Sequence, residues 1–286
     1  MKVLLTGATG FLGTHLTRHL LAAGHEVLPV SRQSGVGFDW SDESLKRGVE
    51  ETDVVVNLAG ENIFSRRWTR KQKEKLVTSR VENTRRLAGL LSARGRGVLV
   101  NASAVGFYGP RTDAPVDESE PSGTDFLAQL CRDWEAAAQS ASAGVRVAIV
   151  RIGVILGTED GALKRMLLPF KLGLGGRMGD GRQWVSWVGY RDTVDAFVHA
   201  VTSDDARGPM NLVAPNPVTN REFTATLGRV LGRPSFMPLP AFALKAALGE
   251  MARDLLLAST RVEPRRLPET GFAFTHPDLE AAIRAS

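Results

Sequence analysis

The chain has 286 residues, 43% of them hydrophobic, which is enough to bury one full core or a large domain carrying a smaller one. Basic side chains exceed acidic ones by 36 to 31, and this mild bias excludes a polybasic tail while suiting an anionic ligand. The single cysteine, Cys131, excludes an internal disulfide framework, and it forms no metal-ligand spacing with the five histidines. We therefore expect a globular protein without a metal site.

The N-terminal sequence runs directly into glycines and leaves no room for a signal peptide. No apolar stretch reaches the roughly 18 residues of a membrane span. The cysteine usage is typical of a reducing compartment. We expect a cytoplasmic protein with no membrane partner.

Strand-like runs alternate with helical patterns along the first half of the chain. Strands are expected at residues 2–6, 26–31, 53–57, 98–103 and 145–151, and helices at 12–23, 69–93 and 126–141. This alternation predicts an α/β fold: a Rossmann-type doubly wound parallel sheet with helices on both faces.

The rhythm changes after about residue 153, where glycines and prolines become frequent. We expect a dinucleotide-binding domain at 1–153 and a smaller, interleaved C-terminal α/β substrate lobe at 154–286. A later segment near 184–213 is expected to complete the sheet. The glycine-dense segment 173–181 is expected to move freely over a cleft.

The stretch "LLTGATGFLG", residues 4–13, predicts a turn between the first strand and the first helix. Such a turn points free N–H groups and the positive end of the helix dipole outward, which suits a pyrophosphate. Gly7 would permit the tight turn, Gly10 the approach of phosphate, and Gly13 close helix packing. The spacing is GxxGxxG, so a turn that needs glycine only for packing is the alternative. The residues expected to bind a dinucleotide here are Gly7, Thr9, Gly10, Phe11, Leu12 and Gly13.

The end of the second strand distinguishes the two dinucleotides. An acidic residue there would bind the adenosine ribose of NAD, but this strand ends "LPVSRQ", with Ser31 and Arg32 in that place. Arginine pairs with phosphate and serine donates a hydroxyl without negative charge. We therefore predict NADP (NADPH) as the cofactor, the alternative for Arg32 being an ordinary surface arginine.

Several motifs resemble the extended short-chain dehydrogenase/reductases, the NAD(P)-dependent epimerase/dehydratase superfamily. They are "TGATGFLG", "VVVNLAG", "SAVGFYG", "WEAAA" and "SWVGYRDTVDA". The stretches "NLAGENI", "RRW", "RIGVILG", "MLLPFKLGLGG" and "PRRLPETGFAF" are similar to an atypical, nucleoside-diphosphate-sugar-epimerase-like subfamily. The resemblance covers essentially the whole chain.

The resemblance implies further cofactor contacts and an oligomer. Leu58, Ala59 and Gly60 would line the dinucleotide after the third strand. Arg80 would reach back to a cofactor phosphate, unless it is a surface arginine, and Val154 would pack near the nicotinamide. A homodimer through the helices at 69–93 and 126–141 is also implied.

The tyrosine and lysine that transfer the proton in the resembled enzymes are absent. Registering the chain on Glu135 of "WEAAA" places Leu127 at the tyrosine position and Cys131 at the lysine position. Leucine has no proton to give, and cysteine cannot supply a permanent cation.

Three other residues are candidates for the catalytic role. Ser103 ends the fourth strand, where a serine reaches the substrate or the nicotinamide amide of the cofactor in the resembled enzymes, or it satisfies local backbone. Glu61 would donate a proton if burial raised its pKa, or it pairs with Arg66 or Arg67. Tyr108 follows the fourth strand, where a role in the loop is the alternative.

Two hypotheses from different classes follow. The first is an NADP(H)-binding, epimerase-like oxidoreductase for a small, anionic, carbonyl or hydroxyl compound such as a nucleotide sugar, with a non-standard proton donor. The second is a non-catalytic regulatory protein that senses NADP(H), for example in cell division. The basic stretch 65–75 with Trp68 invites a nucleic-acid reading. Because an anionic cofactor or substrate explains the same charges, we expect no nucleic-acid partner.

Overall fold

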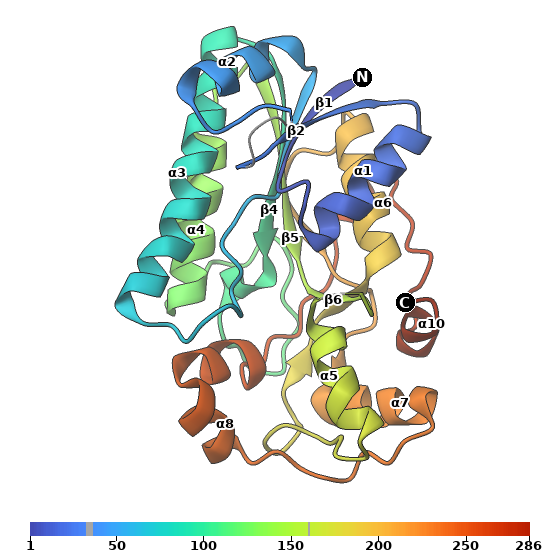
Figure 1. Ribbon diagram of the computed structural model, residues 1–286. Coiled ribbons are helices and arrows are strands. Elements are labelled where there is room, and N and C mark those ends of the chain that lie inside the picture. The colour runs from blue at the N-terminus through green and yellow to red at the C-terminus, as the bar shows by residue number, and fades with distance from the viewer. Residues whose placement is uncertain (33–36, 160) are drawn as a thin grey trace.

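Six parallel strands form the centre of the computed structural model, which describes residues 1–32, 37–159 and 161–286 (Figure 1). Their order is β2-β1-β3-β4-β5-β9, and every neighbouring pair is parallel. The strands are β1 (Lys2–Thr6), β2 (Glu26–Val30), β3 (Val54–Asn57), β4 (Gly97–Ala104), β5 (Val145–Ile152) and β9 (Gly208–Leu212). The predicted fold class is confirmed, and the sixth strand comes from within the stretch 184–213.

Helices cover both faces of this sheet. α1 (Phe11–Ala22) and α6 (Tyr190–Thr202) lie on one face, and α2 (Asp42–Glu51), α3 (Arg70–Arg94) and α4 (Phe126–Gln139) lie on the other (Figure 1). Because water reaches neither face, the inner strands are hydrophobic on both sides, and all four residues of β3 are buried.

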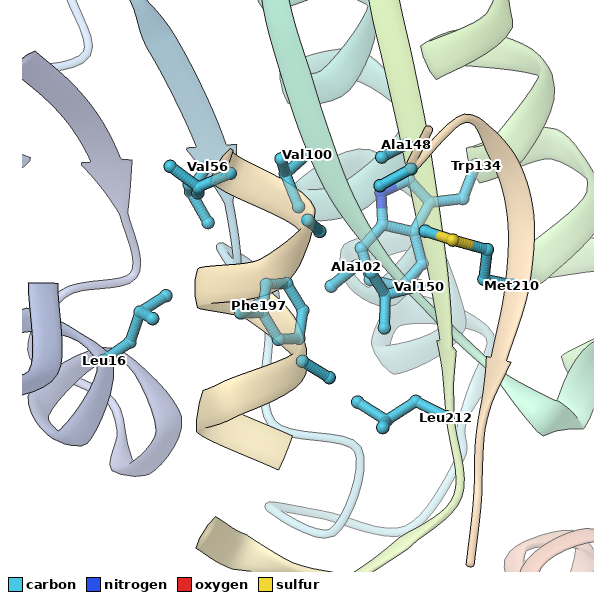
Figure 2. Close-up of a cluster of buried hydrophobic side chains, with 14 of the residues drawn as sticks. Leu16, Val56, Val100, Ala102, Trp134, Ala148, Val150, Phe197, Met210 and Leu212 are labelled. Carbon is cyan, nitrogen blue, oxygen red and sulfur yellow. The ribbon is translucent and has the colours of Figure 1, made fainter. Parts of the chain in front are cut away.

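Alternate strand residues supply two separate cores. Val56, Val100 and Val150 pack with Leu16 of α1 and Phe197 of α6 (Figure 2). The intervening residues pack with leucines of α2 and α3 in a second cluster, which includes Leu45, Leu87, Leu91, Val55, Leu99 and Ile149. The two cores hold α1 and α3 in place against the strands whose ends carry the candidate site.

The remaining elements lie mostly beyond one end of the sheet and contain α5 (Gly161–Lys171), α7 (Asn220–Leu231) and α8 (Ala241–Leu248) (Figure 1). Two short sheets pair β6 (Val154–Leu156) with β8 (Trp187–Gly189), and β7 (Trp184–Val185) with β10 (Val218–Thr219). The short helices are η1 (Val105–Tyr108), η2 (Ala252–Leu256), α9 (Arg266–Glu269) and α10 (Leu279–Arg284). None of the helices in the described residues is long and apolar enough to cross a bilayer.

The sequence suggested that the glycine-dense segment 173–181 moves freely. In the structure it is paired with another stretch of backbone. Its backbone is paired with residues 237–239: Met237 N–H donates to the Gly175 carbonyl at 3.1 Å, and Gly179 N–H donates to the Leu239 carbonyl at 2.8 Å. A side chain on Gly176 would lie 1.8 Å from the Met237 carbonyl oxygen. The glycines therefore serve a close contact between two backbones.

Buried hydrogen bonds join the ends of three strands to two helices. The Asn57 side chain accepts from the Thr6 hydroxyl at 2.7 Å and donates to Asn101 Oδ1 at 2.7 Å and Thr84 Oγ1 at 2.8 Å. Trp134 Nε1 of α4 also donates to Thr84 Oγ1, at 2.9 Å. Because buried polar groups are costly when unpaired, this network sets the relative positions of β1, β3, β4, α3 and α4.

Replacing Asn57 with alanine is expected to destabilise the protein by about 2–4 kcal/mol, because three buried partners lose their hydrogen bonds. Denaturant unfolding measures this. Asn62→Ala is the control, since Asn62 is exposed and, among the residues that the structure describes, its side chain accepts a hydrogen bond from Phe64 N–H alone. Its cost should stay below about 1 kcal/mol. An equal loss of unfolding free energy in the two variants would show that the hydrogen bonds of Asn57 contribute no more to stability than those of an exposed asparagine.

Candidate functional site

The turn from β1 into α1 is built by close backbone contacts. Gly7 has φ of +72°, and a side chain there would lie 3.0 Å from the Leu58 carbonyl group. A side chain on Gly13 would lie 2.1 Å from the Gly7 carbonyl oxygen. Both glycines are required by the geometry, which brings the first turn of α1 directly onto the end of β1.

The N-terminus of α1 is open. Gly10 is its N-cap, no side chain caps the helix, and its first turn holds no acidic residue. Thr9 and Gly10 are exposed, and a side chain on Gly10 would meet only the Gly7 carbonyl oxygen, at 3.3 Å. Uncapped N–H groups and the positive end of the helix dipole thus face space that an anion can enter, next to Phe11, Leu12 and Gly13.

The loop after β3 lies beside this turn. Leu58 and Ala59 are half-buried, and their N–H groups donate to Thr6 Oγ1 at 3.2 and 3.1 Å. Gly60 follows and is exposed. Because β1 and β3 are neighbours, the structure brings residues 58–60 to the same edge of the sheet as the glycine turn.

Ser31 and Arg32 follow β2 on the other side of β1. The Ser31 N–H donates to the Phe38 carbonyl at 2.8 Å, and Ser31 is buried while Arg32 is exposed. An exposed arginine one strand away from the helix N-terminus can meet a second phosphate of a ligand that extends along the edge.

Phe11 and Val154 link this edge to the smaller lobe. The Phe11 ring lies so close to Gly157 that a side chain there would be 2.4 Å from it, and it contacts the His15 ring at a centroid distance of 5.0 Å. Val154 opens β6, half-buried, and its N–H donates to the Ser186 carbonyl at 2.8 Å. The segment after β6 therefore packs on the first turn of α1.

The Ser103 hydroxyl is engaged inside the protein. It donates to Glu135 Oε1 at 2.6 Å, and Arg151 binds both oxygens of that carboxylate, at 2.9 and 2.8 Å. All three side chains are buried. The pair of Glu135 and Arg151 is a two-point ion pair without solvent, so its charges depend on one another.

Tyr108 belongs to the same network and is fully buried in η1. Its hydroxyl accepts from Arg151 Nη1 at 2.9 Å and donates to Asn211 Oδ1 at 2.8 Å. Burial raises the pKa of Tyr108 to about 12, against the lowering effect of Arg151. Both hydrogen-bonding directions of this phenol are thus used by protein groups.

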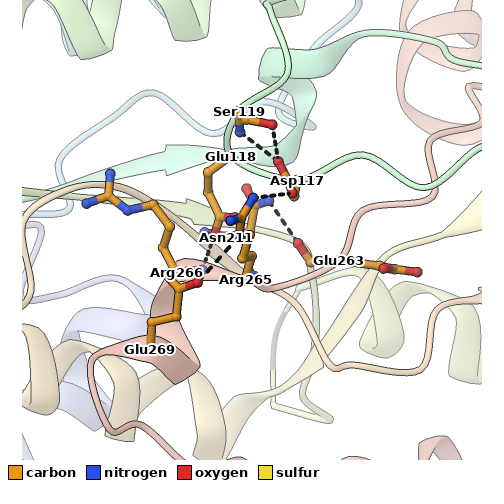
Figure 3. Close-up of polar contacts among 8 residues, drawn as sticks. All are labelled: Asp117, Glu118, Ser119, Asn211, Glu263, Arg265, Arg266 and Glu269. Carbon is orange, nitrogen blue, oxygen red and sulfur yellow. Dashed lines mark hydrogen bonds and ion pairs between the residues drawn. The ribbon is translucent and has the colours of Figure 1, made fainter.

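Asn211 is fixed by hydrogen bonds to Glu118 and to Glu263 of the C-terminal segment (Figure 3). Its backbone N–H donates to Glu118 Oε1 at 2.8 Å and its side chain donates to the Glu263 carbonyl at 3.0 Å. Glu118 also accepts the N–H groups of Arg265 and Arg266. These bonds leave the Asn211 oxygen turned to Tyr108.

Leu127 and Cys131 occupy one face of α4 against η1. A side chain on Gly106 would lie 3.5 Å from Leu127 Cβ and 4.0 Å from Cys131 Sγ. Burial, followed by the charge of Glu135, raises the pKa of the Cys131 thiol to about 12. Leu127 and Cys131 therefore give this face of α4 neither an acidic proton nor a cation.

A cation nevertheless reaches this place from α3. The Arg80 guanidinium lies 5.2 Å from the centre of the Trp134 ring and so close to Gly60 that a side chain there would be 2.9 Å from its central carbon. Burial lowers the pKa of Arg80, opposed by the charges of Cys131 and Glu61. Arg80 is therefore not an ordinary surface arginine.

Glu61 is partly exposed next to Gly60. Its carboxylate accepts from Ser65 Oγ at 3.2 Å and Gln72 Nε2 at 3.4 Å, and in the described part of the chain it forms no ion pair with Arg66 or Arg67. Its own N–H donates to Ser79 Oγ at 3.0 Å, which brings it to the side of α3 that carries Arg80.

The structure thus gathers the predicted residues in two groups. The first group, at the ends of β2, β1 and β3, holds the glycine turn, Ser31, Arg32 and residues 58–60, with Arg80 against Gly60 and Glu61 following it. The second, at the end of β4, holds Ser103. The sequence did not reveal Arg151 as the partner of Glu135, or Asn211 as the partner of Tyr108. An arginine within the apolar strand "VRVAIVRI" needs a buried partner, and that signal points to an acidic residue such as Glu135.

Comparison with known proteins identifies the family. Residues 3–213 match the model of the NAD dependent epimerase/dehydratase family. The chain belongs to this family. Residues 239–286 match a second model, described as a domain of unknown function, DUF1731.

Relatives in this family match along nearly the whole chain. The human epimerase family protein SDR39U1 is 41% identical over 289 residues, covering 99% of both chains, and the Mycobacterium tuberculosis epimerase family protein MT2273 is 42% identical over 98% of this chain and 96% of its own. A crystal structure of human SDR39U1 with NADPH superposes with a TM-score of 0.94, at 40% identity over 100% and 98% of the two chains. The nucleoside-diphosphate sugar epimerase of Corynebacterium glutamicum gives 0.80, at 36% identity over 99% of this chain and 57% of its own.

Arg151→Met is expected to cost about 3–5 kcal/mol in the free energy of unfolding, because Glu135 would stay buried without its counter-charge. The matched control is Arg70→Met: Arg70 pairs with Glu74 at 3.1 Å on an exposed surface, where the loss should not exceed about 1 kcal/mol. Adding Glu135→Leu should recover part of the loss. No recovery in the double variant would contradict the dependence of the two charges on each other.

The phenol of Tyr108 should stay protonated at pH 10, where an exposed tyrosine is half ionised. The chain holds two tyrosines, so the Tyr190→Phe variant reports Tyr108 alone. Near-ultraviolet absorbance of the folded variant should show no half-ionised phenolate at that pH. Ionisation at pH 10 with native circular dichroism would show that Tyr108 is solvated.

Proposed function

We propose that the protein is an NADP(H)-binding, epimerase-like oxidoreductase that acts on a small carbonyl or hydroxyl compound, nucleotide sugars included. The observation that carries this proposal is the uncapped N-terminus of α1 at Gly10, framed by two glycines that admit no side chain. It is supported by membership of the epimerase/dehydratase family and by the NADPH in the human SDR39U1 structure.

The cofactor would lie along the edge of the sheet from β2 to β4. Its pyrophosphate fits the open end of α1, and Arg32 with Ser31 would hold the additional phosphate of NADP. The loop 58–60 and Val154 would contact its remaining parts. The residues assigned to NADP are Gly7, Thr9, Gly10, Phe11, Leu12, Gly13, Ser31, Arg32, Leu58, Ala59, Gly60, Arg80, Ser103 and Val154.

When bound, NADPH supplies a hydride to the substrate. The protein must supply the proton. The Tyr108 and Ser103 hydroxyls donate to Asn211 and Glu135, so Ser103 is left to accept a hydrogen bond and orient a ligand. We assign the proton transfer to Glu61 or to a water beside it, at the partly exposed end of β3.

A non-catalytic sensor of NADP(H) is the second candidate. It is favoured by the side chains of Leu127 and Cys131, which are buried where the related enzymes carry tyrosine and lysine. A sensor would bind the cofactor tightly and leave it unchanged.

Compartment and partners follow from the same proposal. We place the protein in the cytoplasm, with a small anionic substrate and without nucleic acid or membrane partners. We propose a homodimer through α3 and α4, which small-angle scattering of the purified protein would test.

The wild-type protein should bind NADPH more tightly than NADH. Arg32→Gln should weaken NADPH binding about tenfold and leave NADH binding nearly unchanged, because only NADPH carries the phosphate that Arg32 would meet. Titration followed by nicotinamide fluorescence measures both constants. Arg18→Gln, an exposed arginine of α1, is the control. An equal loss of affinity for NADPH and NADH would show that Arg32 does not determine the preference for NADPH.

The NADPH complex should lose its nicotinamide fluorescence when incubated with a panel of aldehydes, ketones and nucleotide sugars if the protein is an oxidoreductase. Glu61→Gln should slow that loss about a hundredfold without changing NADPH affinity, because it removes the proposed proton donor. A stable signal with every substrate, despite tight NADPH binding, would favour the sensor instead.

A further inference from the structure

Large apolar side chains gather on the exposed surface of the smaller lobe. The described residues hold nine exposed large hydrophobic side chains, and all of them except Met1 and Leu21 belong to two short segments, 168–174 and 236–242. We call these side chains the apolar face. They are Leu168, Leu172, Leu174, Phe236, Met237, Leu239 and Phe242, and the two phenylalanines are 75% and 77% exposed.

Backbone contacts join the two segments into one surface. Residues 237–239 pair with residues 175–179 through N–H···O bonds of 3.1, 2.9 and 2.8 Å. A side chain on Gly173, just after α5, would lie 3.9 Å from Pro234, and one on Gly179 would lie 3.8 Å from Ala241 at the start of α8. The end of α5 and the start of α8 are thus fixed to the same pair of loops, which form the end of the lobe away from the sheet (Figure 1).

The composition of α8 shows that this surface lacks a covering partner. Lys245 is the one polar residue among the eight of this helix. A helix that is apolar all round is normally buried on every side. Here Phe242, Ala243, Ala246 and Ala247 are exposed. A contiguous exposed apolar surface of this kind is typical of a site where another molecule binds.

The charges around the apolar face are all positive. The ranges 164–177 and 233–245 hold six of the 36 basic side chains of the chain and none of its 31 acidic ones. All six are exposed, and no carboxylate of the described residues forms an ion pair with any of them. They are Lys164, Arg165, Lys171, Arg177, Arg233 and Lys245. A molecule that covers this face must therefore be both apolar and anionic.

This requirement distinguishes between the molecules that could cover the face. A second copy seated face to face would bring like charges together, which costs affinity. An anionic bilayer matches the charge, but the loops 172–177 and 234–240 would bring non-helical backbone toward hydrocarbon, which offers its polar groups no partner. A protein segment can supply apolar side chains, carboxylates and hydrogen-bond partners together.

We propose that the apolar face binds an acidic amphipathic helix of a partner protein. Its leucine or phenylalanine side chains would cover Phe236 and Phe242, and carboxylates flanking that apolar stripe would meet the surrounding lysines and arginines. The cations would speed association and make the affinity depend on salt. The proposal goes beyond the NADP(H) function and does not rest on it, because none of the residues assigned to NADP belongs to this face.

Selection from a display library of short random peptides on the full-length protein tests the proposal. The enriched peptides should combine leucine or phenylalanine at helical spacing with several aspartates or glutamates. Fluorescence anisotropy then gives the dissociation constant of one such peptide. The double variant Phe236→Ser/Phe242→Ser should weaken its binding at least about tenfold. Lys171→Gln/Arg177→Gln should weaken it as well and reduce its dependence on salt.

Matched controls lie outside the face. Leu21→Ser changes an exposed leucine of α1, and Lys46→Gln changes an exposed lysine of α2, so both should leave peptide binding unaffected. Thermal melting and NADPH titration should give wild-type values for every variant, because the changed side chains are exposed and lie away from the cofactor edge.

Four outcomes would overturn the proposal. They are the absence of any enriched peptide, enrichment of neutral or basic peptides, peptide binding that survives the double phenylalanine variant, and preferential binding to vesicles of phosphatidylglycerol, which would assign the face to a membrane. Sedimentation velocity adds a separate test. A wild-type dimer that dissociates in Phe236→Ser/Phe242→Ser would assign the face to a second copy and so contradict the proposal.

Discussion

The hydrogen bonds of the Asn57 side chain are the interaction on which the rest of the site depends. Asn57 ends β3, and its amide reaches Thr6 at the end of β1 and Asn101 within β4. Thr6 in turn accepts the N–H groups of Leu58 and Ala59. The ends of β1 and β3 and the middle of β4 are thereby aligned by buried polar contacts.

This alignment explains why the glycine turn can be so tight. Because the loop after β3 lies against Gly7, a side chain on Gly7 would collide with the Leu58 carbonyl, and the helix that begins at Gly10 must come close to β1 through Gly13. The helix end is uncapped because its N-cap residue, Gly10, has no side chain. An anion that binds there would accept from these free N–H groups and meet the positive end of the helix dipole.

The sheet, the main helices and the edge that carries the site could be predicted from the sequence, because they rest on local patterns. Continuous apolar runs mark β1 and β3, and Gly95 ends α3 in the left-handed conformation expected of a C-terminal cap. The partners within the site could not. Ser103 and Glu135 are 32 residues apart, and Tyr108 and Asn211 are 103 apart, so their pairing depends on the register of β4, β5 and β9. The expectation that segment 173–181 moves freely was wrong for the same reason, because the backbone that pairs with it, residues 237–239, lies far away in the sequence.

The tyrosine and lysine of the resembled enzymes would both lie on α4. At this edge of the sheet the positive charge comes from a different helix. On α4 the two positions carry Leu127 and Cys131, uncharged side chains packed against η1, and Glu135 of that helix pairs with Arg151 of β5 within the core. A cation comes from α3, on a guanidinium whose ordinary pKa lies so far above neutral pH that it stays protonated although burial lowers that pKa. A lysine in the same surroundings would lose its proton far more readily, because its ordinary pKa is about 10.4. An arginine therefore maintains a permanent positive charge at the end of β3, although no carboxylate of the described residues forms an ion pair with it.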